Sequence, residues 1–145
     1  MRVKDLMNPK VLVVREDDSV ADLLDALVGR HIHGAPVVDA GGDLVGMVSQ
    51  LDVHFGSMTR SRESGEDSAA TGQSLKVREI MTSPAVHVTE EATVTDLCRM
   101  MHRLRIHRVP VVRGRKVIGV ISSLDICGAI GRGESLTAPD RPAKK

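Results

Sequence analysis

A chain of 145 residues has room for one ordinary domain or two small fused halves, and 41% hydrophobic with 27% charged residues is typical of a soluble globular protein. The formal net charge of +1 provides no overall field for nucleic acid or a membrane surface, and 1% aromatic residues leave few faces on which bases could stack. Two cysteines without a CxxC motif, no apolar run approaching about 18 residues and no visible signal peptide predict a reducing, cytoplasmic location.

The dominant feature of the sequence is an internal duplication. Residues 3–7, Val-Lys-Asp-Leu-Met, return 74 positions later as Val-Arg-Glu-Ile-Met, and the strand-like segment 33–38 returns at 107–112. Residues 46–53 return 73 positions later. Each repeat of about 50 residues is marginal alone for a hydrophobic core, so the duplication predicts two similar units that pack together about a pseudo-two-fold axis. The predicted division is repeat 1 at 1–58, a flexible linker at 59–74, repeat 2 at 75–131 and a disordered tail at 132–145.

The predicted elements follow the same order in both repeats. In the first, a strand at 11–14 precedes a helix capped at Ser19, and strands at 35–39 and 44–49 flank a Gly41-Gly42 turn before a helix that starts at residue 51. In the second, the strand at 85–88 precedes a helix capped at Thr93, then strands at 109–112 and 117–121, then a helix at 124–130. These patterns predict an α/β (α+β) fold built from two β-α-β-β-α repeats.

The strongest chemical signal is the pattern Gly-h-h-Ser-x-x-Asp, where h is apolar, which occurs twice at a predicted strand-to-helix junction. It places Ser49 with Asp52 and Ser122 with Asp125. Free backbone N–H groups at a helix start favour phosphate, and a carboxylate accepts two hydrogen bonds from a ribose diol. The same pattern is close to a capping box, which is the stronger explanation for an isolated copy. Two copies, each beside a matching His-x-h-Pro strand, favour a ligand site, and one residue can serve both roles.

These motifs resemble the cystathionine-beta-synthase (CBS) domain, which occurs as a tandem pair called a Bateman module. The resemblance covers residues 3–57 and 77–130 and rests on the Val-x-[Asp/Glu]-h-Met segment, the h-x-h-Pro-Val-Val strand and the Gly-h-h-Ser-x-x-Asp motif. It implies that two repeats form one half of a disc, that two chains pair as a homodimer, and that adenosine nucleotides bind in clefts between the repeats. It also implies a regulatory rather than a catalytic protein.

By this resemblance, Asp52 and Asp125 are expected to bind ribose, with Ser49 and Ser122 as hydroxyl partners. The residues expected to frame the base and reach toward phosphate are Ile32, His33 and Gly34 in the first repeat and Ile106, His107 and Arg108 in the second. The opposite wall near the first strand is expected to contain Asn8, Val11, Thr82 and Val86.

The two repeats differ where phosphate is expected. No acidic residue lies between Asp96 and Asp125, an interval that contains six arginines and one lysine. Guanidinium groups pair well with phosphate oxygens, so Arg108, inside the motif, is the best phosphate ligand and the second repeat the favoured site. Arg99 and Arg103, at helical spacing, fit a solvated helix face better.

Other chemistries find less support. Cys98 with His102 and His31 with His33 form pairs, whereas a metal site needs three or four convergent ligands. The sequence contains no nucleophile elbow, P-loop or dinucleotide fingerprint, so no catalytic residue is assigned. We therefore expect a homodimeric module that binds AMP, ADP or ATP and acts on a separate effector protein; the sequence does not rank these ligands against S-adenosylmethionine. The alternatives are a ligand-free dimerisation scaffold and, less favoured, a nucleic-acid binder through residues 99–116.

Overall fold

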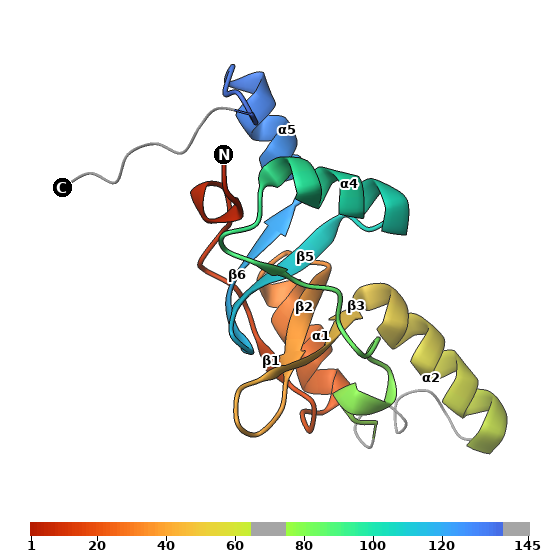
Figure 1. The fold of residues 1–145 in the computed structure, drawn as a ribbon. Coiled ribbons are helices and arrows are strands. Elements are labelled where there is room, and N and C mark those ends of the chain that lie inside the picture. Colours follow the sequence, from red (N-terminus) through yellow and green to blue (C-terminus); the bar gives the residue numbers. More distant parts are fainter. Residues whose placement is uncertain (65–74, 138–145) are drawn as a thin grey trace. The chain divides into compact units, whose positions relative to one another are not determined.

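The structure is a computed structural model that describes residues 1–64 and 75–137 (Figure 1). The chain forms two compact units whose limits differ from those of the sequence repeats. One, here called the central unit, is Leu12–Ala85; the other, the terminal unit, combines Met1–Val11 with Val86–Lys145. The first eleven residues therefore fold with the second repeat rather than with the first.

The central unit contains β1 (Val14–Arg15), α1 (Val20–Gly29), β2 (Gly34–Val38), β3 (Leu44–Ser49), α2 (Gln50–Ser64) and the 3₁₀ turn η2 (Val77–Glu79). β1 pairs in parallel with β2, which pairs antiparallel with β3. Ser19 is the N-cap of α1, and its side chain accepts a hydrogen bond from the Asp22 N–H. Leu23 and Leu27, fully buried, project from α1 into the core beside the strands.

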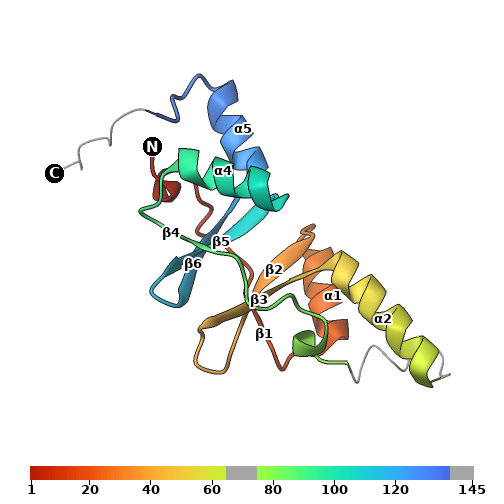
Figure 2. The ribbon, with the colours of Figure 1, turned by 45° about the vertical axis from the view of Figure 1, so that its right-hand side comes forward.

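The terminal unit repeats this order of strands and helices with β4 (Val88–Thr89), α4 (Val94–Leu104), β5 (Arg108–Arg113), β6 (Lys116–Ser122) and α5 (Ser123–Gly131), and its 3₁₀ turn η1 (Val3–Asp5) comes before them in the chain (Figure 2). Its sheet has the order β4-β5-β6 with the same parallel and antiparallel pairings. Leu97 and Ile121, both buried, lie in its core. The predicted α/β fold with two β-α-β-β-α repeats is thus confirmed.

Each unit is completed by a short segment that comes from the other sequence repeat. In the terminal unit, Asn8 and Val120 exchange backbone hydrogen bonds; in the central unit, Met47 and Thr82 do the same. The glycine that opens each Gly-h-h-Ser-x-x-Asp motif allows this approach. A Cβ at Gly119 would lie 2.9 Å from the Asn8 carbonyl oxygen, and one at Gly46 would lie 2.8 Å from that of Thr82.

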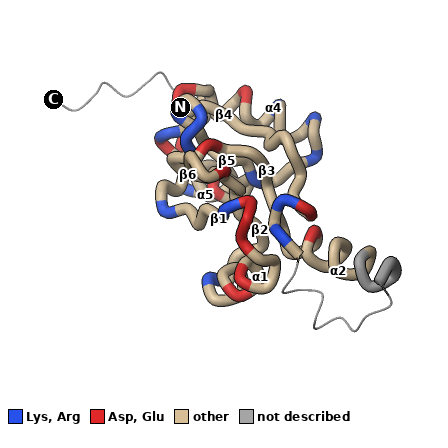
Figure 3. The backbone as a smooth tube through the Cα atoms, turned by 90° about the horizontal axis from the view of Figure 1, so that it is seen from below, with Lys and Arg blue, Asp and Glu red and all other residues tan. Residues whose placement is uncertain are grey.

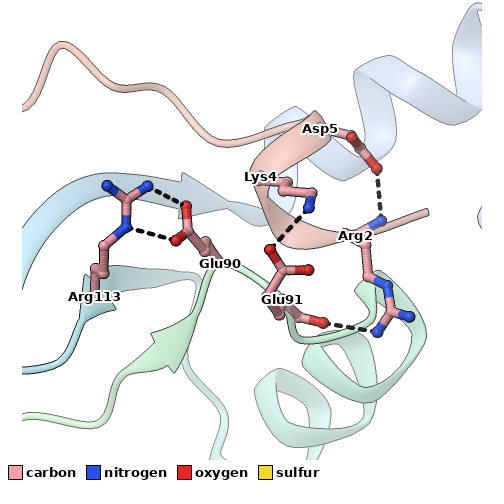
Figure 4. Close-up of polar contacts among 6 residues, drawn as sticks. All are labelled: Arg2, Lys4, Asp5, Glu90, Glu91 and Arg113. Atoms are coloured by element: carbon pink, nitrogen blue, oxygen red, sulfur yellow. Dashed lines mark hydrogen bonds and ion pairs between the residues drawn. The ribbon is translucent and has the colours of Figure 1, made fainter. Parts of the chain in front are cut away.

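Polar contacts join the first residues of the chain to the segment that begins at Val86 within the terminal unit (Figure 4). Lys4 Nζ lies 2.8 Å from a carboxylate oxygen of Glu91, and an Arg2 guanidinium nitrogen donates to the Glu91 carbonyl at 2.8 Å. Beside them, Arg113 makes a bidentate pair with Glu90 at 2.6 and 2.8 Å. The backbone N–H groups of Val3 and Lys4 also donate to carbonyls of residues 90–92.

Several element boundaries differ from the sequence prediction. The first strands of the repeats are Val14–Arg15 and Val88–Thr89 instead of 11–14 and 85–88, because only these residues pair with the neighbouring strands. α2 continues to Ser64, into the range 59–74 predicted as a linker, in agreement with the good helix propensity of Arg and Glu. Within the predicted tail 132–145, the Glu134 N–H donates to Ala129 and Leu136 packs on the terminal core. Residues 65–74 and 138–145 lie outside the described part.

None of the described helices combines the length with the apolar character that crossing a lipid bilayer requires.

Candidate functional site

The first Ser–Asp junction lies where β3 ends and α2 begins. The Ser49 hydroxyl and the Ser49 N–H both donate to Asp52 Oδ2 at 2.8 Å, and the Asp52 N–H donates back to Ser49 Oγ at 3.2 Å. This reciprocal arrangement satisfies backbone donors at the start of the helix. The capping role considered from the sequence is therefore present in the structure.

The second junction, between β6 and α5, has nearly the same geometry. The Ser122 hydroxyl and N–H donate to Asp125 Oδ2 at 2.7 Å, and the Asp125 N–H donates to Ser122 Oγ at 3.3 Å. The duplication thus extends to the hydrogen-bonding pattern of each side chain.

Capping uses only one oxygen of each carboxylate. Among the described residues, neither Asp52 Oδ1 nor Asp125 Oδ1 has a hydrogen-bond partner, and both side chains are half-buried. Because Oδ2 is held by two donors from its serine, the orientation of the carboxylate is fixed before any ligand arrives. Each junction therefore presents one oriented acceptor oxygen, which suits a hydroxyl donor such as a sugar diol.

The His-x-h-Pro strands lie directly beside the junctions. Gly34 pairs with Ser49 across β2 and β3, and Arg108 pairs with Ser122 across β5 and β6. The His33 carbonyl accepts from the first N–H of α2, and the His107 carbonyl accepts from the first N–H of α5, each at 2.9 Å. The side chains of His33, His107 and Arg108 are exposed, so they are available to a ligand at the helix start.

The remaining predicted residues divide between the two units. Thr82 forms backbone hydrogen bonds with Met47, two residues before Ser49, and so lies near the Ser49–Asp52 junction of the central unit. Asn8 forms backbone hydrogen bonds with Val120, two residues before Ser122, and so lies near the Ser122–Asp125 junction of the terminal unit. Val11 and Val86 belong to the terminal unit but lie outside its helices and strands, whereas Ile32 and Ile106 pack against the central and terminal cores, respectively.

The basic stretch of the terminal unit contains both paired and unpaired cations. Arg113 pairs with Glu90, and Arg99 pairs with Asp96 at 2.9 Å. Four arginines form no ion pair with any described residue and are exposed: Arg103, Arg105, Arg108 and Arg115. The unpaired charge at Arg108 is consistent with a role in binding an anion.

Sequence reasoning missed a pocket of ≈ 570 Å³ in the central unit next to Asp52. It is lined by Asp52, Phe55, Gly56, Thr59, Leu75, Glu79 and Ile80. Thr59 lies in the predicted linker, and Leu75, Glu79 and Ile80 precede the first strand of the second repeat. Neither stretch of sequence indicates that these residues line one pocket with Asp52. The proximity of Asp52 to the start of repeat 2 follows only from the crossing of the segment 75–85.

No set of three or more His, Cys, Asp or Glu residues converges as a metal site within residues 1–64 and 75–137. Cys98 and Cys127 are free thiols on α4 and α5. Burial raises the pKa of the Cys98 thiol, and the nearby Cys127 raises that pKa further.

Both repeats of the chain match a known protein family. The CBS domain profile matches the chain twice, at residues 3–55 and 77–132. The uncharacterized protein MJ1404 of Methanocaldococcus jannaschii is 32% identical over 86% of the chain, which spans 31% of that protein's length.

Two solved structures resemble most of the chain. CBSX2 in complex with AMP is 28% identical with a TM-score of 0.76, and the match covers 90% of this chain and 96% of CBSX2. The CBS domain pair of protein MJ0100, in complex with 5-methylthioadenosine and S-adenosyl-L-methionine, is 25% identical with a TM-score of 0.71, covering 90% of this chain and 100% of that pair.

Proposed function

We propose that this chain, which belongs to the CBS domain family through its two matched repeats, is a regulatory module that binds an adenine nucleotide, namely AMP, ADP or ATP. CBS domain pairs similar to it have been solved with AMP and with S-adenosyl-L-methionine and 5-methylthioadenosine, which all contain adenosine. We propose no catalytic reaction for this chain.

The observation that carries the proposal is the unused oxygen at each Ser–Asp junction. Capping alone requires Oδ2, and the fixed, half-buried Oδ1 of Asp52 and Asp125 is a suitable acceptor for a ribose hydroxyl. Charge-assisted hydrogen bonds of this kind contribute about 1.5–3 kcal/mol each. The occurrence of the same geometry in both units supports a site that was duplicated together with the fold.

Phosphate recognition is proposed for the terminal unit. Arg108 pairs in register with Ser122, is exposed and has no carboxylate partner among the described residues. The corresponding position of the central unit is Gly34, where a Cβ would lie 2.9 Å from the Val48 carbonyl oxygen. The central unit therefore lacks a cation at that position, which favours the terminal unit for ligands that carry phosphate.

A regulatory output follows only if the ligand binds one arrangement of the protein better than another. The chain is proposed to act in the cytoplasm as a homodimer and to transmit this change to a separate effector protein.

Titration calorimetry with AMP, ADP, ATP and S-adenosylmethionine tests the proposal. Saturable binding that Asp125→Asn weakens at least about tenfold would support it, since the variant loses the ionised acceptor. Asp96→Asn is the matched control, because Asp96 Oδ2 accepts from the Thr93 hydroxyl at 2.7 Å in a similar cap on α4. Equal loss in both variants, or no binding to the folded wild type, contradicts the proposal.

A ligand-free scaffold remains the second candidate, because the helices expose large apolar side chains. Leu51, Phe55 and Leu124 are 62%, 59% and 78% exposed, respectively. Such a scaffold would assemble as a dimer and show no heat with any of the four ligands.

A further inference from the structure

We propose that two copies of this chain associate head to tail, so that α1 and α2 of one copy pack against α4 and α5 of its partner. The inference deepens the homodimer of the proposed function and decides its direction. It rests on charge and on side-chain size at equivalent positions of the two repeats.

The near-neutral net charge conceals two units of opposite sign. The central unit has 6 Lys and Arg against 12 Asp and Glu, a formal charge of −6, whereas the terminal unit has 14 against 7, a formal charge of +7. Figure 3 marks these charges along the chain. Contact between two central units, or between two terminal units, would bring charges of the same sign together, whereas a central unit and a terminal unit of different copies attract each other.

The exposed faces of α1 and α4 also differ in the sign of their charge. On α1, the exposed residues Leu24, Asp25 and Val28 lie on one side of the helix. Their equivalents on α4, 74 positions later, are Cys98, Arg99 and His102. Asp25 has no ion pair among the described residues, and Arg99 is paired only with the exposed Asp96 in its own helix. Position 25 is therefore acidic where its counterpart is basic.

Side-chain size gives a second, independent complementarity. α2 exposes Leu51, Phe55 and Met58 along one face. The equivalents 73 positions later on α5 are Leu124, Gly128 and Gly131. No atom lies within 4 Å of a Cβ placed at Gly131, and only the Arg132 guanidinium comes within 3.3 Å of one at Gly128.

These sizes fit only one direction of association. In a head-to-tail dimer, the bulky Phe55 and Met58 face the two glycines of α5 in the partner. A like-with-like dimer would bring each bulky side chain against its own copy and leave the glycine positions facing each other across a gap, which loses packing. The neighbouring contacts of α1 with α2 and of α4 with α5 make each pair one continuous docking face.

Charge reversal tests the direction. Head to tail, Asp25→Arg places two arginines opposite each other across the interface, and Arg99→Asp places two aspartates together; each variant is expected to raise the dimer dissociation constant about tenfold by sedimentation equilibrium. The double variant Asp25→Arg with Arg99→Asp restores attraction and returns the constant to near the wild-type value. Unchanged single variants, or a double variant no tighter than either single one, would overturn the inference.

Cross-linking provides a second measurement that does not depend on affinity. In a background with Cys98→Ser and Cys127→Ser, an Asp25→Cys chain and an Arg99→Cys chain of different mass are mixed and oxidised. Head-to-tail association yields the mixed disulfide as the main product, whereas each chain cross-linking to its own kind overturns the direction. A monomeric wild type would overturn the homodimer itself, and calorimetry with nucleotide remains a separate test of ligand binding.

Discussion

Asn8 and Val120 exchange two backbone hydrogen bonds of 2.8 and 3.0 Å, although they come from different sequence repeats. Met47 and Thr82 are related in the same way in the central unit, at 3.0 and 2.8 Å. The compact units are therefore assembled from parts of both repeats, and each depends on a segment that docks against a motif glycine.

This dependence predicts a large effect of a small substitution. Gly119→Ala places a methyl group 2.9 Å from the Asn8 carbonyl oxygen and 3.0 Å from Met7 Sδ, so the segment 1–11 must shift. We expect the free energy of unfolding to fall by about 1–3 kcal/mol, as for other overpacked sites, in urea denaturation. Gly29→Ala is the control, since nothing lies within 4 Å of a Cβ there. Equal stability of the two variants would contradict the close approach.

Ser122→Ala separates the structural from the ligand-binding role of the second junction. The variant removes the hydroxyl that donates to Asp125 Oδ2 and accepts from the Asp125 N–H. We expect a loss of about 0.5–2 kcal/mol in stability, typical of an N-cap serine, measured by urea denaturation. The Asp125 carboxylate keeps its bond from the residue 122 N–H, so nucleotide binding should weaken less than in Asp125→Asn. A variant as stable as the wild type would show that the cap contributes little.

Arg108→Gln should discriminate among ligands rather than abolish all binding. If its guanidinium contacts phosphate, affinity for AMP or ATP is expected to fall about tenfold or more, while adenosine binds as it does to the wild type. Calorimetry with each ligand measures the difference. Arg115→Gln, a similarly exposed arginine without a carboxylate partner among the described residues, is the matched control. A uniform loss for adenosine and nucleotides alike would remove Arg108 from phosphate recognition.

The sequence was sufficient to predict the order of elements and the Ser–Asp junctions, because both depend on local patterns. Runs of β-branched residues separated by turn residues indicate the strands. Ser122 and Asp125 are the N-cap and N3 residues of a single helix, three positions apart. The repeat also predicts that the two junctions are equivalent, and their hydrogen-bond distances agree within 0.1 Å.

The exchange of segments could not be predicted in this way. The segments that contain Val3 and Val77 are copies of each other, and each comes directly before the strands of its own repeat, so the sequence favours packing against that repeat. In the structure, Val3 is instead buried in the terminal core and Val77 in the central core. The choice between packing on the adjacent repeat and packing on the other depends on long-range contacts that leave the local pattern unchanged. The pocket beside Asp52 was missed for the same reason.

The pair formed by Glu90 and Arg113 predicts a pH-dependent contribution to stability. The hydrogen bond from Arg113 lowers the pKa of the Glu90 carboxyl below its ordinary value, and the nearby charges of Arg113 and Lys4 act in the same direction against burial. Because the folded pKa is the lower one, the stabilisation is fully present above about pH 4.5 and is lost as the pH falls through the folded pKa. Arg113→Gln should therefore be less stable than the wild type at pH 7, and the difference should shrink toward pH 3.

Urea denaturation of both proteins at several pH values between 3 and 7 measures this difference, with Arg115→Gln as the control because it removes an equal charge from the same hairpin. Arg115 has no ion pair among the described residues, so its replacement should leave the pH dependence of stability unchanged. A destabilisation by Arg113→Gln that stays constant down to pH 3 would mean that Arg113 acts through packing of its side chain rather than through the ionised Glu90.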